Sequence, residues 1–264
     1  MKLGFIGCGN MAKAMISGVL SSSLLSKNEI FASDNSDAQL LSAREKYEIN
    51  TLKCNTEIAQ KCDYVVLAVK PNYYEAVIEQ IKDYVDEKTV IITIAAGKSI
   101  DFVSGKFGKK VKIIRTMPNT PAMVGEGMTA VCPNEFVSES ELEIALSVFN
   151  SFGKSALVAE TMIDAVIAVS GSSPAYVYMF IEAMADAAVI QGMPREMAYQ
   201  FASQAVIGSA KTVMETGIHP GKLKDMVCSP AGTTIEAVRV LEEKGFRSSI
   251  IEAMTACAEK SKNM

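Results

Sequence analysis

The sequence predicts an α/β domain followed by an all-helical domain, and two patterns along its 264 residues support this. Up to about residue 160, short apolar runs alternate with helical segments, which is typical of a doubly wound parallel sheet. After residue 160 the strand-length runs disappear, and long segments rich in Ala and Met follow. We therefore expect the two domains at residues 1–160 and 161–264.

The first dozen residues define the kind of α/β domain. Residues 3–6 have the length and apolar character of a buried strand, and residues 7–12 (Gly-Cys-Gly-Asn-Met-Ala) fit G-x-G-x-x-A before a helical segment. In a dinucleotide-binding domain Gly7 makes the turn, Gly9 lets the backbone approach a pyrophosphate, and Ala12 lets the helix pack on the sheet. The phosphates lie at the helix N-terminus. This context predicts a Rossmann-type domain; the alternative is a glycine turn in another α/β protein.

A polar turn follows the second predicted strand, residues 29–33. Asp34 occupies the place where a dinucleotide fold puts the residue that meets the adenosine ribose; the alternative is a capping or turn aspartate. An acidic side chain favours NADH and repels the 2′-phosphate of NADPH, whereas Ser33, Asn35 and Ser36 could donate hydrogen bonds to that phosphate. The turn contains no Arg or Lys, and the nearest basic side chain after it is Arg44. The choice between NADPH and NADH therefore stays open.

Further candidates lie at the carboxyl ends of later strands, where open α/β sheets bind ligands. The apolar run 63–69 leads to Lys70, which is either a neighbour of the cofactor or a surface lysine before a proline-started helix. Asn55 follows a short strand, and its alternative role is to cap the next helix. The other predicted elements are strands at residues 50–54, 89–95, 111–115 and 125–131, and helices at 37–47 and 138–152, the last with Ser138 and Glu141 at capping-box spacing.

The second half is helical. The segment 175–191 is apolar on almost every face, which is typical of a helix that is buried all round. Further helices are predicted at residues 161–169, 194–216 and 247–260 and from the turn 228–234. So many apolar helices in one small domain predict that a second subunit supplies part of the burial; the alternative is a self-contained bundle. The single histidine, His219, is expected to be a loop or capping residue.

Composition excludes several classes of protein. The formal net charge is −4, so there is no electrostatic footprint for nucleic acid or an anionic membrane surface. No apolar run is long enough to span a bilayer, and the chain begins on a strand, so we expect no signal peptide. The six Cys are scattered without a C-x-x-C pair, which predicts reduced thiols, a cytoplasmic protein and no bound metal.

Three stretches together resemble the pyrroline-5-carboxylate reductase family: residues 4–12 (Gly-Phe-Ile-Gly-Cys-Gly-Asn-Met-Ala), residues 115–121 (Arg-Thr-Met-Pro-Asn-Thr-Pro) and residues 219–235 (His-Pro-Gly-Lys-Leu-Lys-Asp-Met-Val-Cys-Ser-Pro-Ala-Gly-Thr-Thr-Ile). Residues 169–176 (Val-Ser-Gly-Ser-Ser-Pro-Ala-Tyr) fit the same family. The resemblance implies a Rossmann domain with a helical dimerisation domain. It also implies hydride transfer from NADPH or NADH to 1-pyrroline-5-carboxylate, giving L-proline in the last step of proline biosynthesis. Family members form interlocked homodimers that often assemble further into decamers.

The resemblance also implies site residues. Together with Asp34 and Asn35 of the polar turn, the expected cofactor contacts are Ile6, Gly7, Cys8, Gly9, Asn10, Met11, Ser33, Asn55, Ala68, Val69, Lys70, Pro71, Ala95 and Gly97. The expected substrate contacts are Ser229, Gly232, Thr233 and Thr234, whose N–H groups and hydroxyls suit a carboxylate. Family members commonly have Gly-Gly before Thr-Thr, but this chain has Ala231 at the first position. If that position requires a positive φ, alanine is strained there.

Two rival functions remain to be separated from this one. A β-hydroxyacid dehydrogenase shares the two-domain plan but carries a catalytic Lys shortly after a glycine-rich turn, and residues 171–180 contain no Lys. A nucleotide-sensing binding protein that has lost its chemistry is the second rival, and the intact loop 229–234 argues against it. Turnover of the imine with a reduced cofactor separates all three.

Overall fold

The computed structural model describes residues 1–263, which form two compact units. The first unit holds Met1–Ser172 together with the last helical turns from Cys257 onward, and the second holds Ser173–Ala256. The domain boundary expected after residue 160 stays a prediction.

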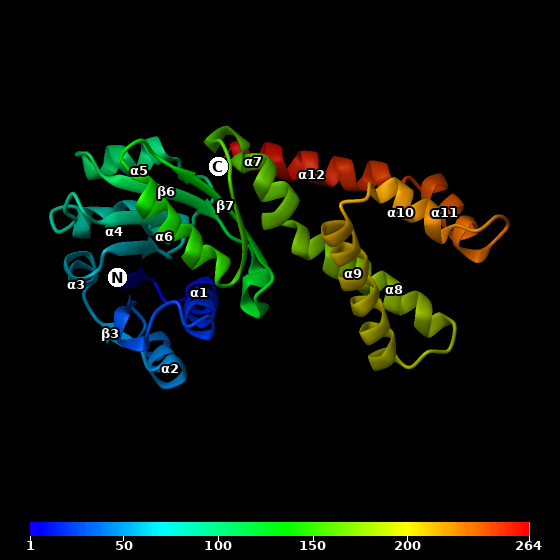
Figure 1. Ribbon diagram of the computed structural model, residues 1–264, viewed down its shortest axis with the longest axis horizontal. Helices are drawn as coiled ribbons and strands as arrows, with labels where there is room; N and C mark the ends of the chain where they lie inside the picture. The colour runs from blue at the N-terminus through cyan, green and yellow to red at the C-terminus, as the bar shows by residue number, and fades with distance from the viewer. Residues whose placement is uncertain (264) are drawn as a thin grey trace. The chain divides into compact units, whose positions relative to one another are not determined.

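One eight-stranded sheet forms the centre of the first unit, in the order β3-β2-β1-β4-β5-β6-β7-β8 (Figure 1). The strands are β1 (Leu3–Ile6), β2 (Ile30–Ser33), β3 (Asn50–Leu52), β4 (Tyr64–Leu67), β5 (Val90–Thr93), β6 (Lys112–Met117), β7 (Gly127–Pro133) and β8 (Gly153–Leu157). Neighbouring strands are parallel except β6 and β7, so the expectation of a parallel sheet throughout is wrong at this pair. The connection from Met117 to Gly127 is shorter than the crossover of about a dozen residues that a parallel pair needs.

Helices cover both faces of this sheet, as a doubly wound fold requires. On one side lie α1 (Asn10–Ser21), α2 (Asp37–Tyr47) and α6 (Glu139–Asn150), and on the other lie α3 (Asn55–Lys61), α4 (Tyr74–Ile81) and α5 (Ile100–Phe107). Because side chains alternate along a strand, Phe5 packs in the core beneath α1, α2 and α6, and Ile6 packs in the core beneath α3, α4 and α5. Both faces are buried, which is why these strands read as continuous apolar runs.

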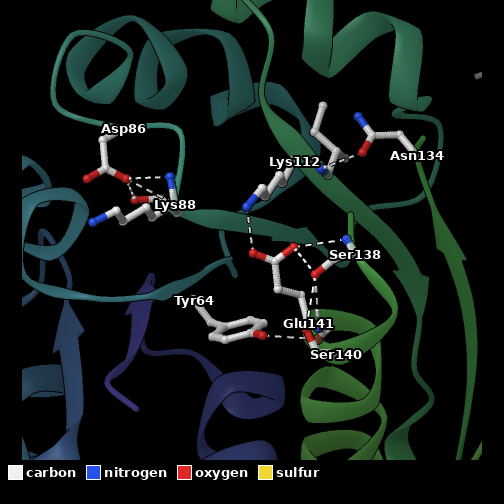
Figure 2. Close-up of polar contacts among 10 residues, drawn as sticks. Tyr64, Asp86, Lys88, Lys112, Asn134, Ser138, Ser140 and Glu141 are labelled. Atoms are coloured by element: carbon white, nitrogen blue, oxygen red, sulfur yellow. Dashed lines mark hydrogen bonds and ion pairs between the residues drawn. The ribbon is translucent and has the colours of Figure 1, made fainter. Parts of the chain in front are cut away.

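The start of α6 shows how local sequence signals become structure (Figure 2). Ser138 Oγ accepts from the N–H of Glu141, and the Glu141 carboxylate accepts from the Ser138 N–H at 2.9 Å, so the predicted capping box is confirmed. The same carboxylate accepts from Lys112 Nζ at 2.6 Å, and Tyr64 OH donates to the Glu141 carbonyl at 3.0 Å. Partial burial alone would raise the pKa of Glu141, but the hydrogen bonds from Lys112 and Ser138 lower it below its ordinary value. The box thus ties α6 to β6 and β4.

The chain after the sheet is helical throughout the described residues. Its helices are α7 (Ile163–Val166), which continues as a π-helical turn (Ile167–Gly171), α8 (Ser173–Ile190), α9 (Arg195–Thr216), α10 (Pro220–Val227), α11 (Thr233–Glu243) and α12 (Phe246–Lys262). Helix α10 was not predicted. The His219 side chain caps it by accepting from the Gly221 N–H at 3.1 Å, which confirms the capping role.

The helices of the second unit leave most of their apolar side chains in solvent. Only Ala185, Ala198 and Ala202 are buried among its residues, whereas Met179 is 68% and Ile190 is 81% exposed. Helices α8 and α9 lie side by side (Figure 1), but this hairpin covers only small side chains. The alternative of a self-contained bundle is therefore wrong, because a single chain does not provide the burial that the sequence pattern demands.

Candidate cofactor and substrate sites

The turn between β1 and α1 has the geometry that the glycine pattern predicts. Gly7 has φ +97°, and a Cβ there would lie 2.6 Å from the Ala68 carbonyl oxygen, so no larger residue fits without displacing backbone. Gly9 is extended, with φ −76°, and a Cβ there would meet nothing within 4 Å. No side chain caps the N-terminus of α1. The first N–H groups of the helix therefore have no side-chain cap, which leaves them available to a phosphate.

Strand register brings several predicted residues to one edge of the sheet. Ile6 pairs with Ser33 on one side and with Leu67 on the other, so the residues that follow these three strands begin at the same level. The strand order reverses between β1 and β4, and ligands of doubly wound folds bind at such a switch point.

A cavity of about 570 Å³ lies at this switch point. Its lining contains nine of the predicted cofactor residues, which are Ile6, Gly7, Gly9, Asp34, Asn35, Asn55, Ala68, Val69 and Lys70. Two other predicted contacts, Cys8 and Ser33, are buried and do not line the cavity. The remaining five also lie outside the lining, at the starts of the adjoining helices and after β5: Asn10, Met11, Pro71, Ala95 and Gly97. The cavity has room for part of a dinucleotide.

Asp34 is held by two backbone N–H groups. Its Oδ2 accepts from the Cys8 N–H at 2.7 Å, and its Oδ1 accepts from the Ser36 N–H at 2.8 Å. The carboxylate therefore joins the glycine turn to the start of α2, while Ser36 itself caps α2. The turn role of Asp34 is observed, and its side chain also lines the cavity. The turn role and a cofactor-binding role are therefore compatible at this position, and contact of Asp34 with the ribose stays a prediction.

Hydrogen bonds also hold two other lining residues, Asn55 and Gln80. Ser33 Oγ donates to Asn55 Oδ1 at 2.8 Å, and Asn55 Nδ2 donates to Gln80 Oε1 at 2.8 Å. Asn55 is the first residue of α3, not its cap, so the capping alternative is wrong for this side chain. The two hydrogen bonds hold the Asn55 amide in one orientation at the edge of the cavity.

Sequence reasoning missed a group of lining residues on two helices. Gln39 of α2 and Tyr73, Ala76, Val77 and Gln80 at the start and along one side of α4 line the cavity. The last four recur at the three- and four-residue spacing of a single helix face. That spacing could have identified them once the strand end at Lys70 was placed.

The predicted substrate loop lies in the second unit, at the start of α11. Gly232 is the N-terminal flanking residue of α11, no side chain caps this helix, and Thr233 and Thr234 form its first turn. A Cβ at Gly232 would lie 2.3 Å from Ser229 Oγ, so a larger residue fits this turn only if the Ser229 side chain rotates away. Ala231 has φ +56°, which confirms that the position requires a left-handed backbone and that alanine is strained there.

Within residues 1–263 no group of three or more His, Cys, Asp or Glu side chains could hold a metal ion. In the same residues no helix is long and apolar enough to cross a membrane.

The turn, the helix N-terminus and the cavity at the switch point together define a dinucleotide-binding domain. A family model described as NADP oxidoreductase coenzyme F420-dependent matches residues 2–97, and one described as Pyrroline-5-carboxylate reductase dimerisation matches residues 160–264. The chain is 51% identical over 263 residues to pyrroline-5-carboxylate reductase of Escherichia coli, covering 100% of this chain and 98% of the relative. The chain therefore belongs to the pyrroline-5-carboxylate reductase family, and its dimerisation domain indicates an oligomer.

Solved structures agree with this assignment. A pyrroline-5-carboxylate reductase from Coxiella burnetii matches with a TM-score of 0.92 at 34% identity, over 99% of this chain and 97% of that one. The Plasmodium falciparum pyrroline carboxylate reductase, solved with NADP bound, matches with a TM-score of 0.91 at 34% identity, over 100% and 97% of the two chains.

Proposed function

We propose that this chain reduces 1-pyrroline-5-carboxylate to L-proline with NADPH, and also accepts NADH, as the last step of proline biosynthesis. The observation that carries the proposal is 51% identity over the full chain to a reductase of that name. The glycine turn at Gly7 and the uncapped start of α11 are both present in this chain and supply the two binding geometries that the reaction needs.

The residues around the cavity fit a dinucleotide. The open space in front of Gly9 and the uncapped first turn of α1 suit a pyrophosphate, because free N–H groups and the helix dipole favour an anion. When bound, the reduced nicotinamide supplies the hydride. The residues that we propose to contact the cofactor are Ile6, Gly7, Cys8, Gly9, Asn10, Met11, Ser33, Asp34, Asn35, Asn55, Ala68, Val69, Lys70, Pro71, Ala95 and Gly97. Their task is to bind and orient it.

The loop before α11 is proposed to hold the substrate carboxylate. The hydroxyls of Ser229, Thr233 and Thr234 and the backbone N–H groups after Gly232 are grouped at a helix N-terminus that no side chain caps. Such a group of donors favours a carboxylate. Once its nitrogen is protonated, the imine carbon accepts hydride without a strong general acid, so the loop contributes orientation and electrostatic stabilisation.

The substitution Thr234→Ala tests the role of this loop. It should raise KM for the imine by about tenfold or more and leave KM for the cofactor nearly unchanged, because a hydrogen bond to a charged group is worth about 1.5–3 kcal/mol. Thr212→Ala is the matched control, since the Thr212 hydroxyl donates to the Gly208 carbonyl within α9. Equal effects of Thr234→Ala on both KM values would show that the loop is only structural.

We also propose that the protein is a homodimer at least, with decamers as the larger assembly. The support is the apolar surface that the second unit leaves exposed, which includes Met179 and Ile190. A fold that exposes this much apolar side chain is stabilised when a second copy covers it. Sedimentation or light scattering should give a mass of two chains or a multiple. A mass of one chain at micromolar concentration would refute this.

A cytoplasmic location is proposed from the use of cysteine. All six thiols of the chain are free, and Cys8, Cys62 and Cys132 are buried. Buried unpaired thiols suit a reducing compartment. Fractionation of the source cells followed by immunodetection should find the protein with cytoplasmic markers, and recovery with membranes or secreted proteins would contradict the proposal.

A further inference from the structure

The side chain of Lys13 is hydrogen-bonded to a residue that lines the cofactor cavity, yet none of the roles proposed above uses it. Lys13 is on the first turns of α1, and its Nζ donates to Gln39 Oε1 at 2.7 Å and to Ser42 Oγ at 3.2 Å, both on α2. Gln39 lines the cavity together with Asp34 and its neighbours in the polar turn. The tertiary fold thus brings a cation to the turn that has no Arg or Lys of its own.

The charge of Lys13 is not neutralised by a contact. Both hydrogen-bond partners are neutral, and no carboxylate in residues 1–263 forms an ion pair with this ammonium. Burial raises the pKa of the Cys8 thiol. The charge of Lys13 lowers this pKa and the charge of Asp34 raises it, so both charges act on the same loop. An ammonium has three donors, and one remains for a ligand.

We infer that Lys13 is a specificity residue of this chain and favours a cofactor or nucleotide that carries a phosphate on the adenosine 2′-oxygen. The inference rests on the proposed function, because it assumes that the adenosine end of the cofactor occupies this cavity. Asp34 repels a phosphate dianion, and a cation held by Gln39, which lines the same cavity as Asp34, offsets that repulsion. Ser36 and Asn35 are close in sequence and add neutral donors.

The position of Lys13 on another segment explains why the sequence of the turn alone did not predict a preference between NADPH and NADH. Along the sequence the turn carries only a negative charge, whereas Lys13 comes from the preceding helix. Its stem is half-buried between α1 and α2, so the ammonium is held near the turn without being fixed by an ion pair. A charged partner that is held in place in this way discriminates between ligands by their charge.

The test compares two probes, adenosine 2′,5′-bisphosphate and adenosine 5′-monophosphate, which differ only in the 2′-phosphate. Calorimetry on the full-length protein should show that Lys13→Met weakens binding of the bisphosphate by about tenfold or more. The affinity for the monophosphate should change by no more than about twofold. Lys13→Arg should keep most of the preference. Arg44→Met is the matched control, because Arg44 is on α2 but lines other hollows of the surface. It should leave both affinities unchanged.

Two outcomes would overturn the inference. Equal weakening of both probes by Lys13→Met would show that Lys13 only ties α1 to α2, and an unchanged preference would show that the 2′-phosphate lies elsewhere. Turnover of 1-pyrroline-5-carboxylate is measured in parallel. A protein that turns over the imine but shows no effect of Lys13 refutes this inference alone. A protein that shows the Lys13 effect without turnover refutes the proposed function alone.

Discussion

The substitution Gly7→Ala should destabilise the fold, whereas Gly9→Ala should leave it intact and block the cofactor. At Gly7 the new Cβ would lie 2.6 Å from the Ala68 oxygen and 2.8 Å from its carbonyl carbon, and φ is +97°. The backbone conformation costs alanine about 1–2 kcal/mol, and forcing the chain after β4 outward adds about 1–3 kcal/mol. The expected loss in the free energy of unfolding is therefore about 3 kcal/mol.

Gly9 is the matched comparison, because the same methyl group is added two residues away. Its φ of −76° suits alanine, and nothing lies within 4 Å of the new Cβ. Stability should stay equal or rise by about 0.4–1 kcal/mol through the unfolded state. The Cβ nevertheless projects into the space proposed for the pyrophosphate, so NADPH should bind at least about tenfold more weakly.

Denaturant unfolding without ligand and fluorescence titration with NADPH measure the two effects separately. The reasoning predicts opposite profiles: Gly7→Ala is less stable, and Gly9→Ala is stable but binds poorly. Native-like cofactor affinity in Gly9→Ala would refute the placement of the phosphates. Native stability in Gly7→Ala would refute the close approach of the turn to the chain after β4.

Three further substitutions have defined outcomes. Ala231→Gly should raise the free energy of unfolding by up to about 1 kcal/mol in denaturant titrations, because glycine accepts φ +56° without strain; an unchanged or lower value would contradict the strain. Asp34→Ser should lower KM for NADPH and leave KM for NADH nearly unchanged or slightly higher, and an unchanged ratio of the two kcat/KM values means that Asp34 faces away from the ribose. Glu141→Gln should destabilise the fold at neutral pH. Because the folded-state pKa of Glu141 is lowered, its contribution is present above the unfolded pKa and fades as pH falls through the folded pKa, so wild type and variant should converge in acid. A gap that persists in acid would show that charge is not the cause.

Local signals predicted the parts of the site that depend on backbone geometry. The tight turn expected at Gly7 is present, and the left-handed backbone that was raised as a condition for Ala231 is observed. The capping box of Ser138 and Glu141 and the cap at His219 likewise depend only on neighbours in sequence. Such features are predictable because one turn of chain contains every group involved.

Features that depend on tertiary packing were not predictable in this way. Strand β8 (Gly153–Leu157) was missed because it is half exposed and includes Gly153, Lys154 and Ser155, so it lacks an apolar run. The contact of Lys13 with Gln39 joins two helices across a loop and leaves no signal in either segment.

The most direct test of the proposed function is turnover by the purified full-length protein with 1-pyrroline-5-carboxylate and NADPH or NADH. Loss of the reduced cofactor's absorbance and formation of L-proline are measured together. The proposed function predicts that cofactor is oxidised one-for-one with L-proline formed, and that Gly9→Ala loses most of this activity while remaining folded. No oxidation of either cofactor in the presence of the imine by folded protein would contradict it.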